Sequence, residues 1–180
     1  PSIDVRIATA ITHLDDAGVV YRGHDAIELA STATFEQVAE LLWTGELPGA
    51  DTTWRADRRA LTRCRALLGA AEPADPIVRL SICASALADE PHTDATPADA
   101  ARRFLALAPS ILGGPTSGSV AARLTGAWTK RPSDAVVSAV DRALVLLADH
   151  ELASSTLAVR VAASVRSDPL SAIVAGLATM

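Results

Sequence analysis

Aromatic side chains are scarce in this 180-residue chain, at 3% of residues, whereas hydrophobic residues make up 49%. Its core must therefore be built from Ala, Leu, Val and Ile. The strands of β-sandwiches usually depend on aromatic and β-branched residues, so this composition favours close-packed helices. We expect an all-α chain that forms one domain or a large part of a bigger one.

Cysteine and basic charge are also limited. The two cysteines, Cys64 and Cys83, lie in apolar patterns and form neither a CxxC pair nor a disulfide framework, which favours a reduced, cytoplasmic setting. A net charge of −5 argues against binding to nucleic acid. No uncharged run reaches about 18 residues and no basic, apolar leader opens the chain, so we expect neither membrane spanning nor secretion.

Residues 1–24 predict a small β-hairpin, and residues 25–180 predict a helical core. The turn signal is DDAG at residues 15–18, which separates two apolar runs; residues 19–21 would form the returning strand. The core's first clear helix would begin after Thr34, with Gln37 completing a capping box.

The spacing of apolar residues predicts a further helix over residues 53–68. Its buried positions would be Ala60, Leu61, Cys64, Leu67 and Leu68. Its other side carries four arginines, Arg55, Arg58, Arg59 and Arg63. These side chains could bind an anionic partner or form an ordinary solvated face, and we favour the solvated face.

Proline marks the start of three later helices, at Asp75-Pro76, Thr96-Pro97 and Asp168-Pro169. The Gly/Ser/Pro run GGPTSGS, residues 113–119, has no lysine and follows a helix instead of a strand. A P-loop that cradles phosphate is therefore not expected there.

The stretch LLADHELASST, residues 146–156, places three ionisable residues inside an apolar, helical region. The two segments after it, residues 154–165 and 170–180, are apolar nearly all round, which predicts helices buried at the centre of the core. The last of them runs to Met180 without a glycine cap or a polar tail, so we expect the fold to continue beyond this chain.

Two motifs resemble the citrate synthase family. The first motif is similar to the opening of the family and spans residues 19–48, VVYRGHDAIELASTATFEQVAELLWTGELP. The second is similar to the family's later Asp-His-Glu segment and spans residues 141–178, DRALVLLADHELASSTLAVRVAASVRSDPLSAIVAGLA. The resemblance covers essentially the whole chain. It implies that residues 1–180 form part of a citrate synthase-like large domain, roughly the first half of a family member, without the small domain.

The resemblance implies an all-α homodimer that condenses an acyl-CoA, usually acetyl-CoA, with oxaloacetate and then hydrolyses the thioester. It implies no permanently bound cofactor; a coenzyme A thioester would be the co-substrate. Removing a proton from a weakly acidic C–H requires a general base and a stabilised enolate. The residues that do this in the family would lie beyond Met180, so we expect this chain alone to be inactive.

One functional position of the family is matched here. His150 corresponds to the family's oxaloacetate-binding histidine, and the break at residues 149–151 would place its imidazole at a substrate cleft. The alternative is that His150 caps the carbonyl end of the preceding helix, where a cation is favoured. Ala153 replaces an asparagine that is common in the family, and a methyl group cannot form the amide's hydrogen bonds.

Two alternatives stay open, and Ala153 motivates the first of them. The protein could be a non-catalytic paralogue that binds a small carboxylate or acts in regulation, or it could be one subunit of a split enzyme. A metal site is not expected, because the four histidines are scattered. They are His13, His24, His92 and His150.

Overall fold

A computed structural model of the protein describes residues 9–16, 18–49, 52–89, 96–149 and 153–180. Within these ranges nine helices and one small sheet form the regular structure, which confirms the all-α class. The helices are α1 (Ala26–Thr32), α2 (Phe35–Thr44), α3 (Arg58–Ala71), α4 (Pro76–Ala88), α5 (Pro97–Ile111), α6 (Val120–Trp128), α7 (Asp134–Leu146), α8 (Ser154–Ser164) and α9 (Pro169–Leu177). None of these helices is both long enough and apolar enough to cross a membrane.

The predicted hairpin is present and carries one more strand than expected. Strands β1 (Thr12–Asp15) and β2 (Gly18–Tyr21) pair in antiparallel register. A third strand, β3 (His24–Asp25), pairs with the other edge of β2. The turn between β2 and β3 consists of Arg22 and Gly23, both with positive φ, of 51° and 90°. This turn needs a left-handed backbone, which glycine adopts at little cost.

Most helices start at a side chain that accepts a hydrogen bond from the first turn, as predicted. Thr34 and Gln37 form the expected capping box of α2, and Gly45 ends that helix with a φ of 85°. The other helix starts that have a capping side chain are Asp25, Asp57, Asp75, Thr96, Ser119, Ser133 and Asp168. Within the described ranges α8 is the exception, because its N-cap is Ala153.

The predicted start of the helix over residues 53–68 was wrong. Helix α3 begins at Arg58 because the Asp57 carboxylate accepts hydrogen bonds from the amides of Arg59 and Ala60. The residues before it are extended, which lets Trp54 stack on Trp43 with ring centroids 5.4 Å apart.

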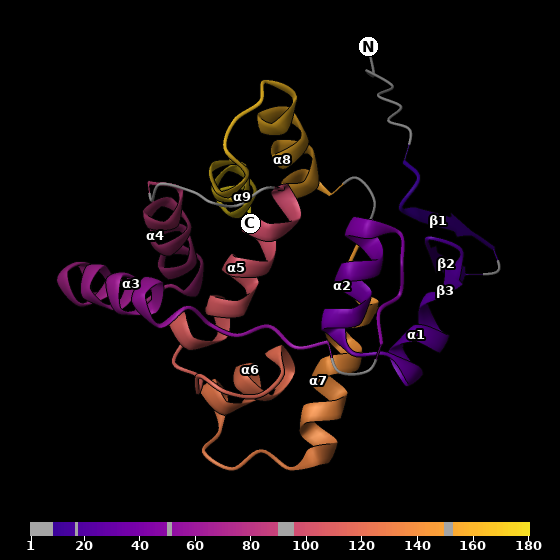
Figure 1. Cartoon of the computed structure of the whole chain (residues 1–180), viewed down its shortest axis with the longest axis horizontal. Coiled ribbons are helices and arrows are strands. Elements are labelled where there is room, and N and C mark those ends of the chain that lie inside the picture. Colours follow the sequence, from indigo (N-terminus) through magenta and orange to yellow (C-terminus); the bar gives the residue numbers. More distant parts are fainter. Residues whose placement is uncertain (1–8, 17, 50–51, 90–95, 150–152) are drawn as a thin grey trace.

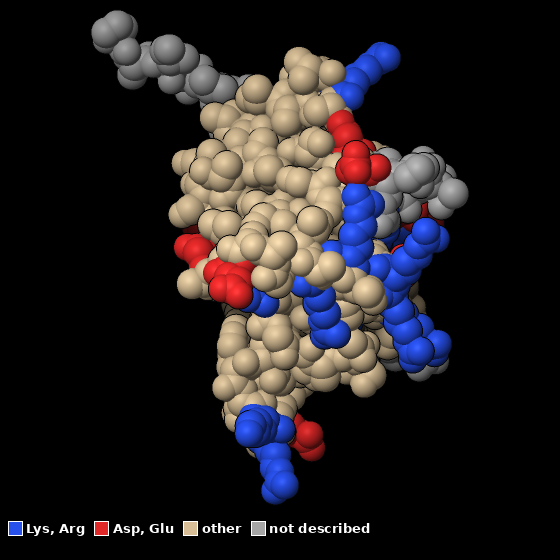
Figure 2. Space-filling view, turned by 90° about the vertical axis from the view of Figure 1, so that its left-hand side faces the viewer, with Lys and Arg blue, Asp and Glu red and all other residues tan. Residues whose placement is uncertain are grey.

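The predicted buried face of α3 is confirmed for four of its five positions. These are Ala60, Leu61, Cys64 and Leu68, whereas Leu67 is 40% exposed. Of the arginines on the other side, Arg63 forms an ion pair with Asp89 at 2.9 Å. Cationic side chains gather on the face that includes α3 and α4 (Figure 2).

Helix α5 runs through the middle of the molecule (Figure 1). On one side of it, α3 and α4 enclose an aliphatic core with Cys64, Cys83 and Phe104, which α9 closes through Leu170. On the other side, the sheet, α1 and α2 pack around Tyr21 and Val145. The sheet thus lies against the end of α7, which is where the polar break in the sequence begins.

The prediction that both final helices are buried at the centre of the core was wrong for α8. No residue of α8 is buried, and Val161 is 60% exposed. Helix α9 packs against α8 and α4 and buries Leu170, Ala172 and Gly176. An apolar helix can therefore lie at the surface of the described structure. Hydrophobic periodicity alone does not distinguish this position from a position at the centre of the core.

Candidate functional site

The candidate site lies at the break between α7 and α8. Helix α7 ends at Leu146, and the amides of Leu147 and Ala148 still donate to the carbonyls of Ala143 and Val145. Helix α8 begins at Ser154. The predicted site residue His150 lies outside the described residues, but Asp149, directly before it, is described.

The N-terminal sheet holds the end of α7 in place. The Tyr21 hydroxyl donates to the carbonyl oxygens of Leu146 at 3.0 Å and Asp149 at 3.3 Å. The Tyr21 side chain is fully buried, and burial raises its pKa above the ordinary value, so the hydroxyl keeps its proton and remains a donor. The Thr12 hydroxyl in turn donates to the Asp149 carboxylate. The start of the break is therefore fixed by side chains from far away in the sequence.

The turn between β2 and β3, which follows Tyr21, also holds the end of α2. The Arg22 guanidinium donates from Nε and Nη2 to the carbonyl oxygen of Leu42, at 3.2 and 2.9 Å. A cation at a helix C-terminus also interacts favourably with the helix dipole. Tyr21 and Arg22, adjacent in sequence, thus connect the ends of α7 and α2.

A groove of about 510 Å³ opens where these helix ends meet α8 and α9. Its polar lining comes from the break and from the first turns of α8. These residues are Asp149, Ser155, Thr156 and Arg160. Its apolar lining consists of Ile11, Leu42, Trp43, Ala148, Val159, Ile173, Gly176, Leu177 and Met180. A concave, mostly apolar site with a few polar groups is typical of small-molecule binding sites.

Gly176 allows α9 to approach α8 at this groove. A Cβ atom at this position would lie 2.6 Å from Val159 Cγ2 and 3.4 Å from the Ser155 carbonyl oxygen. The contact with Val159 would be much closer than ordinary packing allows, whereas the contact with the Ser155 oxygen would be an ordinary one. The width of the groove at this end therefore depends on a residue without a side chain.

The start of α8 departs from the other helices at this site. Ala153 is its N-cap, and a methyl group cannot accept a hydrogen bond from the amides of the first turn. Ser155 and Thr156, whose backbone amides belong to that turn, line the groove. The site thus includes the positive end of a helix dipole.

The structure does not bring the described histidines together. His13 lies in β1 and His24 in β3, and both are exposed; His92, like His150, falls outside the described residues. No group of three or more His, Cys, Asp or Glu residues gathers in the described part of the chain in a way that could hold a metal ion. The two cysteines are buried core thiols, as their apolar patterns predicted.

Several residues of the site were not identified from the sequence. Tyr21 and Arg22 were noted only as part of a family motif, and nothing in their spacing indicates contacts with residues 20 to 128 positions away. Thr156 and Arg160 could have been found, because residues four apart share a helix face and this face follows the polar break.

Comparison with protein families gives one match that covers nearly the whole chain. A family model described as "Citrate synthase, C-terminal domain" matches residues 5–180. A 2-methylcitrate synthase of Mycobacterium tuberculosis is 32% identical over 188 aligned positions, which cover 90% of this chain and 47% of that protein. A citrate synthase of Mycolicibacterium smegmatis is also 32% identical, over 90% of this chain and 50% of that protein.

Solved structures support the same fold. The citrate synthase of Thermotoga maritima matches 96% of this chain and 52% of its own, with a TM-score of 0.74 and 24% identity. The citrate synthase of Thermoplasma acidophilum, solved as a ternary complex with carboxymethyl coenzyme A and oxaloacetate, matches 97% of this chain and 54% of its own, with a TM-score of 0.75 and 24% identity. The chain thus spans about half the length of the relatives it matches.

Proposed function

The chain belongs to the citrate synthase family, and from this we propose that it forms part of an acyltransferase that condenses an acyl-CoA with oxaloacetate. Family members carry the names citrate synthase and 2-methylcitrate synthase. We propose acetyl-CoA as the acyl donor, His150 as an oxaloacetate-binding residue and the groove at the α7–α8 break as the substrate cleft. The catalytic residues would lie outside this chain.

The observation that carries this proposal is the groove beside residue 149. Asp149 lines it and is held by Thr12 and Tyr21, and His150 is the next residue in the sequence. The carbonyls of Ala143, Val145 and Leu146 at the end of α7 accept hydrogen bonds from other groups, so the capping alternative would depend on the remaining acceptor positions there.

The charges of the groove are compatible with a dicarboxylate. Arg160 provides a guanidinium group, which binds carboxylates well, and the first turn of α8 provides backbone dipoles. Asp149 would repel a dianion, but its carboxylate accepts the Thr12 hydrogen bond and is turned to the sheet by this contact. The apolar wall would exclude water and strengthen these interactions.

Calorimetry with oxaloacetate on the full-length protein tests the binding role. His150→Ala should weaken binding by about tenfold to a hundredfold, because a hydrogen bond to a charged group contributes about 1.5–3 kcal/mol. His24→Ala is the matched control, since His24 is an exposed histidine of β3 that does not line the groove. Equal affinity of His150→Ala and the unmodified protein would remove His150 from the site.

Turnover distinguishes the enzyme from its alternatives. Release of free coenzyme A from acetyl-CoA, dependent on oxaloacetate, would support the enzyme, and a faster reaction with propionyl-CoA would correct the proposed acyl donor. Oxaloacetate binding without turnover by the full-length protein would favour the non-catalytic paralogue, for which Ala153 is the motivation. Activity only after a second polypeptide is added would favour the split enzyme.

We also propose that the protein forms a homodimer through its helices. Helix α8 presents Leu157 and Val161 to solvent, 39% and 60% exposed, and Val165 follows in the same stripe at 76%. Their spacing of four residues places them on one helix face, away from the groove residues Thr156 and Arg160. A second copy of the protein would bury this stripe.

A further inference from the structure

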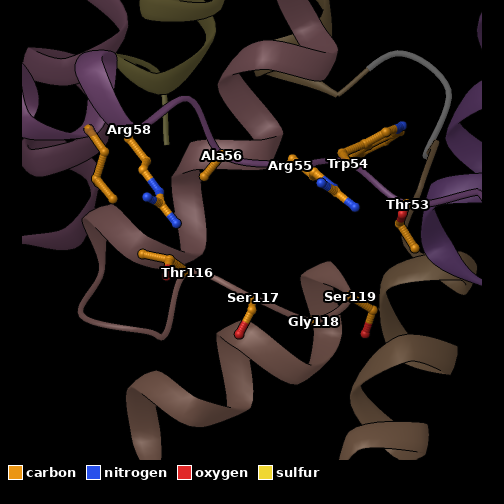
Figure 3. Close-up of a pocket in the computed structure, with 10 residues that line it drawn as sticks. Thr53, Trp54, Arg55, Ala56, Arg58, Thr116, Ser117, Gly118 and Ser119 are labelled. Carbon is orange, nitrogen blue, oxygen red and sulfur yellow. The ribbon is translucent and has the colours of Figure 1, made fainter.

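A second cavity, of about 630 Å³, lies between the segment before α3 and the loop before α6 (Figure 3). Residues 53–56, Arg58 and Leu61 form one wall, and residues 116–119 form the other. The cavity has no lining residue in common with the groove at the α7–α8 break. The two cavities are therefore separate sites.

Two arginines extend into this cavity from the same wall, Arg55 and Arg58 (Figure 3). Within the described part of the chain, neither guanidinium group has a hydrogen bond or an ion pair. Asp57 lies between them in sequence, but its carboxylate caps α3 by accepting the amides of Arg59 and Ala60 at 2.8 and 3.4 Å. Two like charges that share one cavity repel each other, and a bound anion would relieve this repulsion.

The opposite wall provides hydroxyl groups on a tight loop. Thr116, Ser117 and Ser119 line the cavity, and Gly118 has a φ of 101°, which the loop needs to turn. The Ser119 oxygen accepts the Ala122 amide at 3.2 Å, so its own hydrogen remains available for donation. The side-chain oxygens of Ser117 and Ser119 point away from the two arginines (Figure 3), so an anion in the cavity would accept mainly from the guanidinium groups.

A buried cation lies behind this loop. Arg123 is fully buried, and a Cβ atom at Gly118 would lie 3.9 Å from its Cγ. Arg123 donates from Nη1 to the Ala106 carbonyl, and the nearby Glu36 carboxylate accepts the Val120 amide at 2.7 Å. Because Glu36 offsets the charge of Arg123, the excess positive charge at the cavity comes from Arg55 and Arg58.

We propose that this cavity binds the phosphate or pyrophosphate group of a small molecule. A phosphate offers three or four acceptor oxygens in a tetrahedral arrangement and can accept from two guanidinium groups at once, whereas a carboxylate has two oxygens in one plane. Arginine forms bidentate hydrogen bonds with phosphate, and the volume is in the range of about 300–1,000 Å³ typical of ligand sites. The loop does not act as a P-loop here, since the charge comes from arginines of another segment.

Calorimetry with inorganic pyrophosphate on the full-length protein tests the site. The variant Arg55→Gln/Arg58→Gln should bind pyrophosphate at least about tenfold more weakly, the loss of roughly one charge-assisted contact. The control Arg59→Gln/Arg131→Gln removes the same charge from exposed arginines that do not line the cavity, and should change the affinity by less than about twofold. Thermal unfolding of both variants would verify that they fold.

Two further titrations distinguish the source of the phosphate. Free coenzyme A and ADP each carry a pyrophosphate group, and either one binding with the same dependence on Arg55 and Arg58 supports the proposal and identifies the source. His150→Ala should leave pyrophosphate binding unchanged, which separates this site from the proposed function. The proposal is overturned if pyrophosphate does not bind, if both double variants weaken binding equally, or if citrate binds this site as tightly as pyrophosphate.

Discussion

Ala153 decides how helix α8 starts. It is the N-cap, and in place of the hydroxyl or carboxylate found at the other described helix starts it carries a methyl group. The Asn that is common in the family at this position is among the best N-cap residues. An asparagine at position 153 would therefore be expected to cap α8.

We predict that Ala153→Asn stabilises the protein by about 1 kcal/mol, because the amide oxygen would accept a hydrogen bond from the first turn of α8. Urea unfolding monitored by circular dichroism measures the change. Ala163→Asn, in the last turn of the same helix, is the control and should be destabilising by a few tenths of a kcal/mol, since asparagine is a poorer helix former than alanine. A loss of stability in Ala153→Asn would contradict the cap.

At the scale of elements, one ionic network connects α2, α5 and the segment before α3. Glu40 of α2 accepts hydrogen bonds from Arg102 of α5, at 2.5 Å to Nε and 2.7 Å to Nη2, and from Trp54 Nε1 at 3.0 Å. Arg102 also lies over the Trp43 ring, with its Cζ 5.5 Å from the centroid. Trp43 lines the groove, so this network supports one of its walls.

The hydrogen bonds from Arg102 hold the pKa of the Glu40 carboxyl below its ordinary value, against the opposing effect of burial. Since the pKa is lower in the folded than in the unfolded state, Glu40 contributes stability at neutral pH. This contribution is lost as the pH falls through the folded-state pKa. We predict that Glu40→Gln lowers the free energy of unfolding by about 1–3 kcal/mol at pH 7 and by much less near pH 3.

Urea unfolding of the two proteins at several pH values measures this difference. Glu46→Gln is the matched control, because Glu46 is an exposed glutamate that has no ion pair with Arg102. A difference between Glu40→Gln and the unmodified protein that stays constant down to pH 3 would show that the carboxylate charge does not stabilise this network.

At the scale of the whole molecule, packing among the described residues does not explain the exposed apolar stripe of α8, which consists of Leu157, Val161 and Val165. Val161 is 60% exposed although it lies in an apolar helix, and Val165 is 76% exposed. Continuous apolar surfaces of this kind usually mark interaction sites. The proposed homodimer would bury the stripe against a second copy.

We predict that Val161→Glu weakens self-association of the full-length protein by at least about tenfold, because a carboxylate would have to be buried without a partner. Sedimentation velocity at several concentrations measures the effect. Val136→Glu on α7, where the side chain is 46% exposed and away from the stripe, is the matched control and should leave association unchanged. A monomer for the unmodified protein at micromolar concentration would contradict the dimer.

The sequence by itself determined the fold class and most helix starts, because both depend on local chemistry. A shortage of aromatic residues, the spacing of aliphatic ones and capping residues such as Thr34, Asp75 and Thr96 act within one turn of a helix. The hairpin was predictable for the same reason. At α3 the local signal of the Asp57 cap was overlooked, and the extended segment before it could not be predicted locally, because Trp54 stacks there on Trp43, which is not a neighbour in sequence.

The tertiary structure alone decided what surrounds the polar break. Tyr21 and Thr12 reach Leu146 and Asp149 across more than 120 residues, and Gly176 sets how closely α9 approaches α8. The same holds for the cavity between Arg55, Arg58 and residues 116–119. Periodicity records which residues share a face of one helix, but only the packing of several elements brings distant side chains into one site.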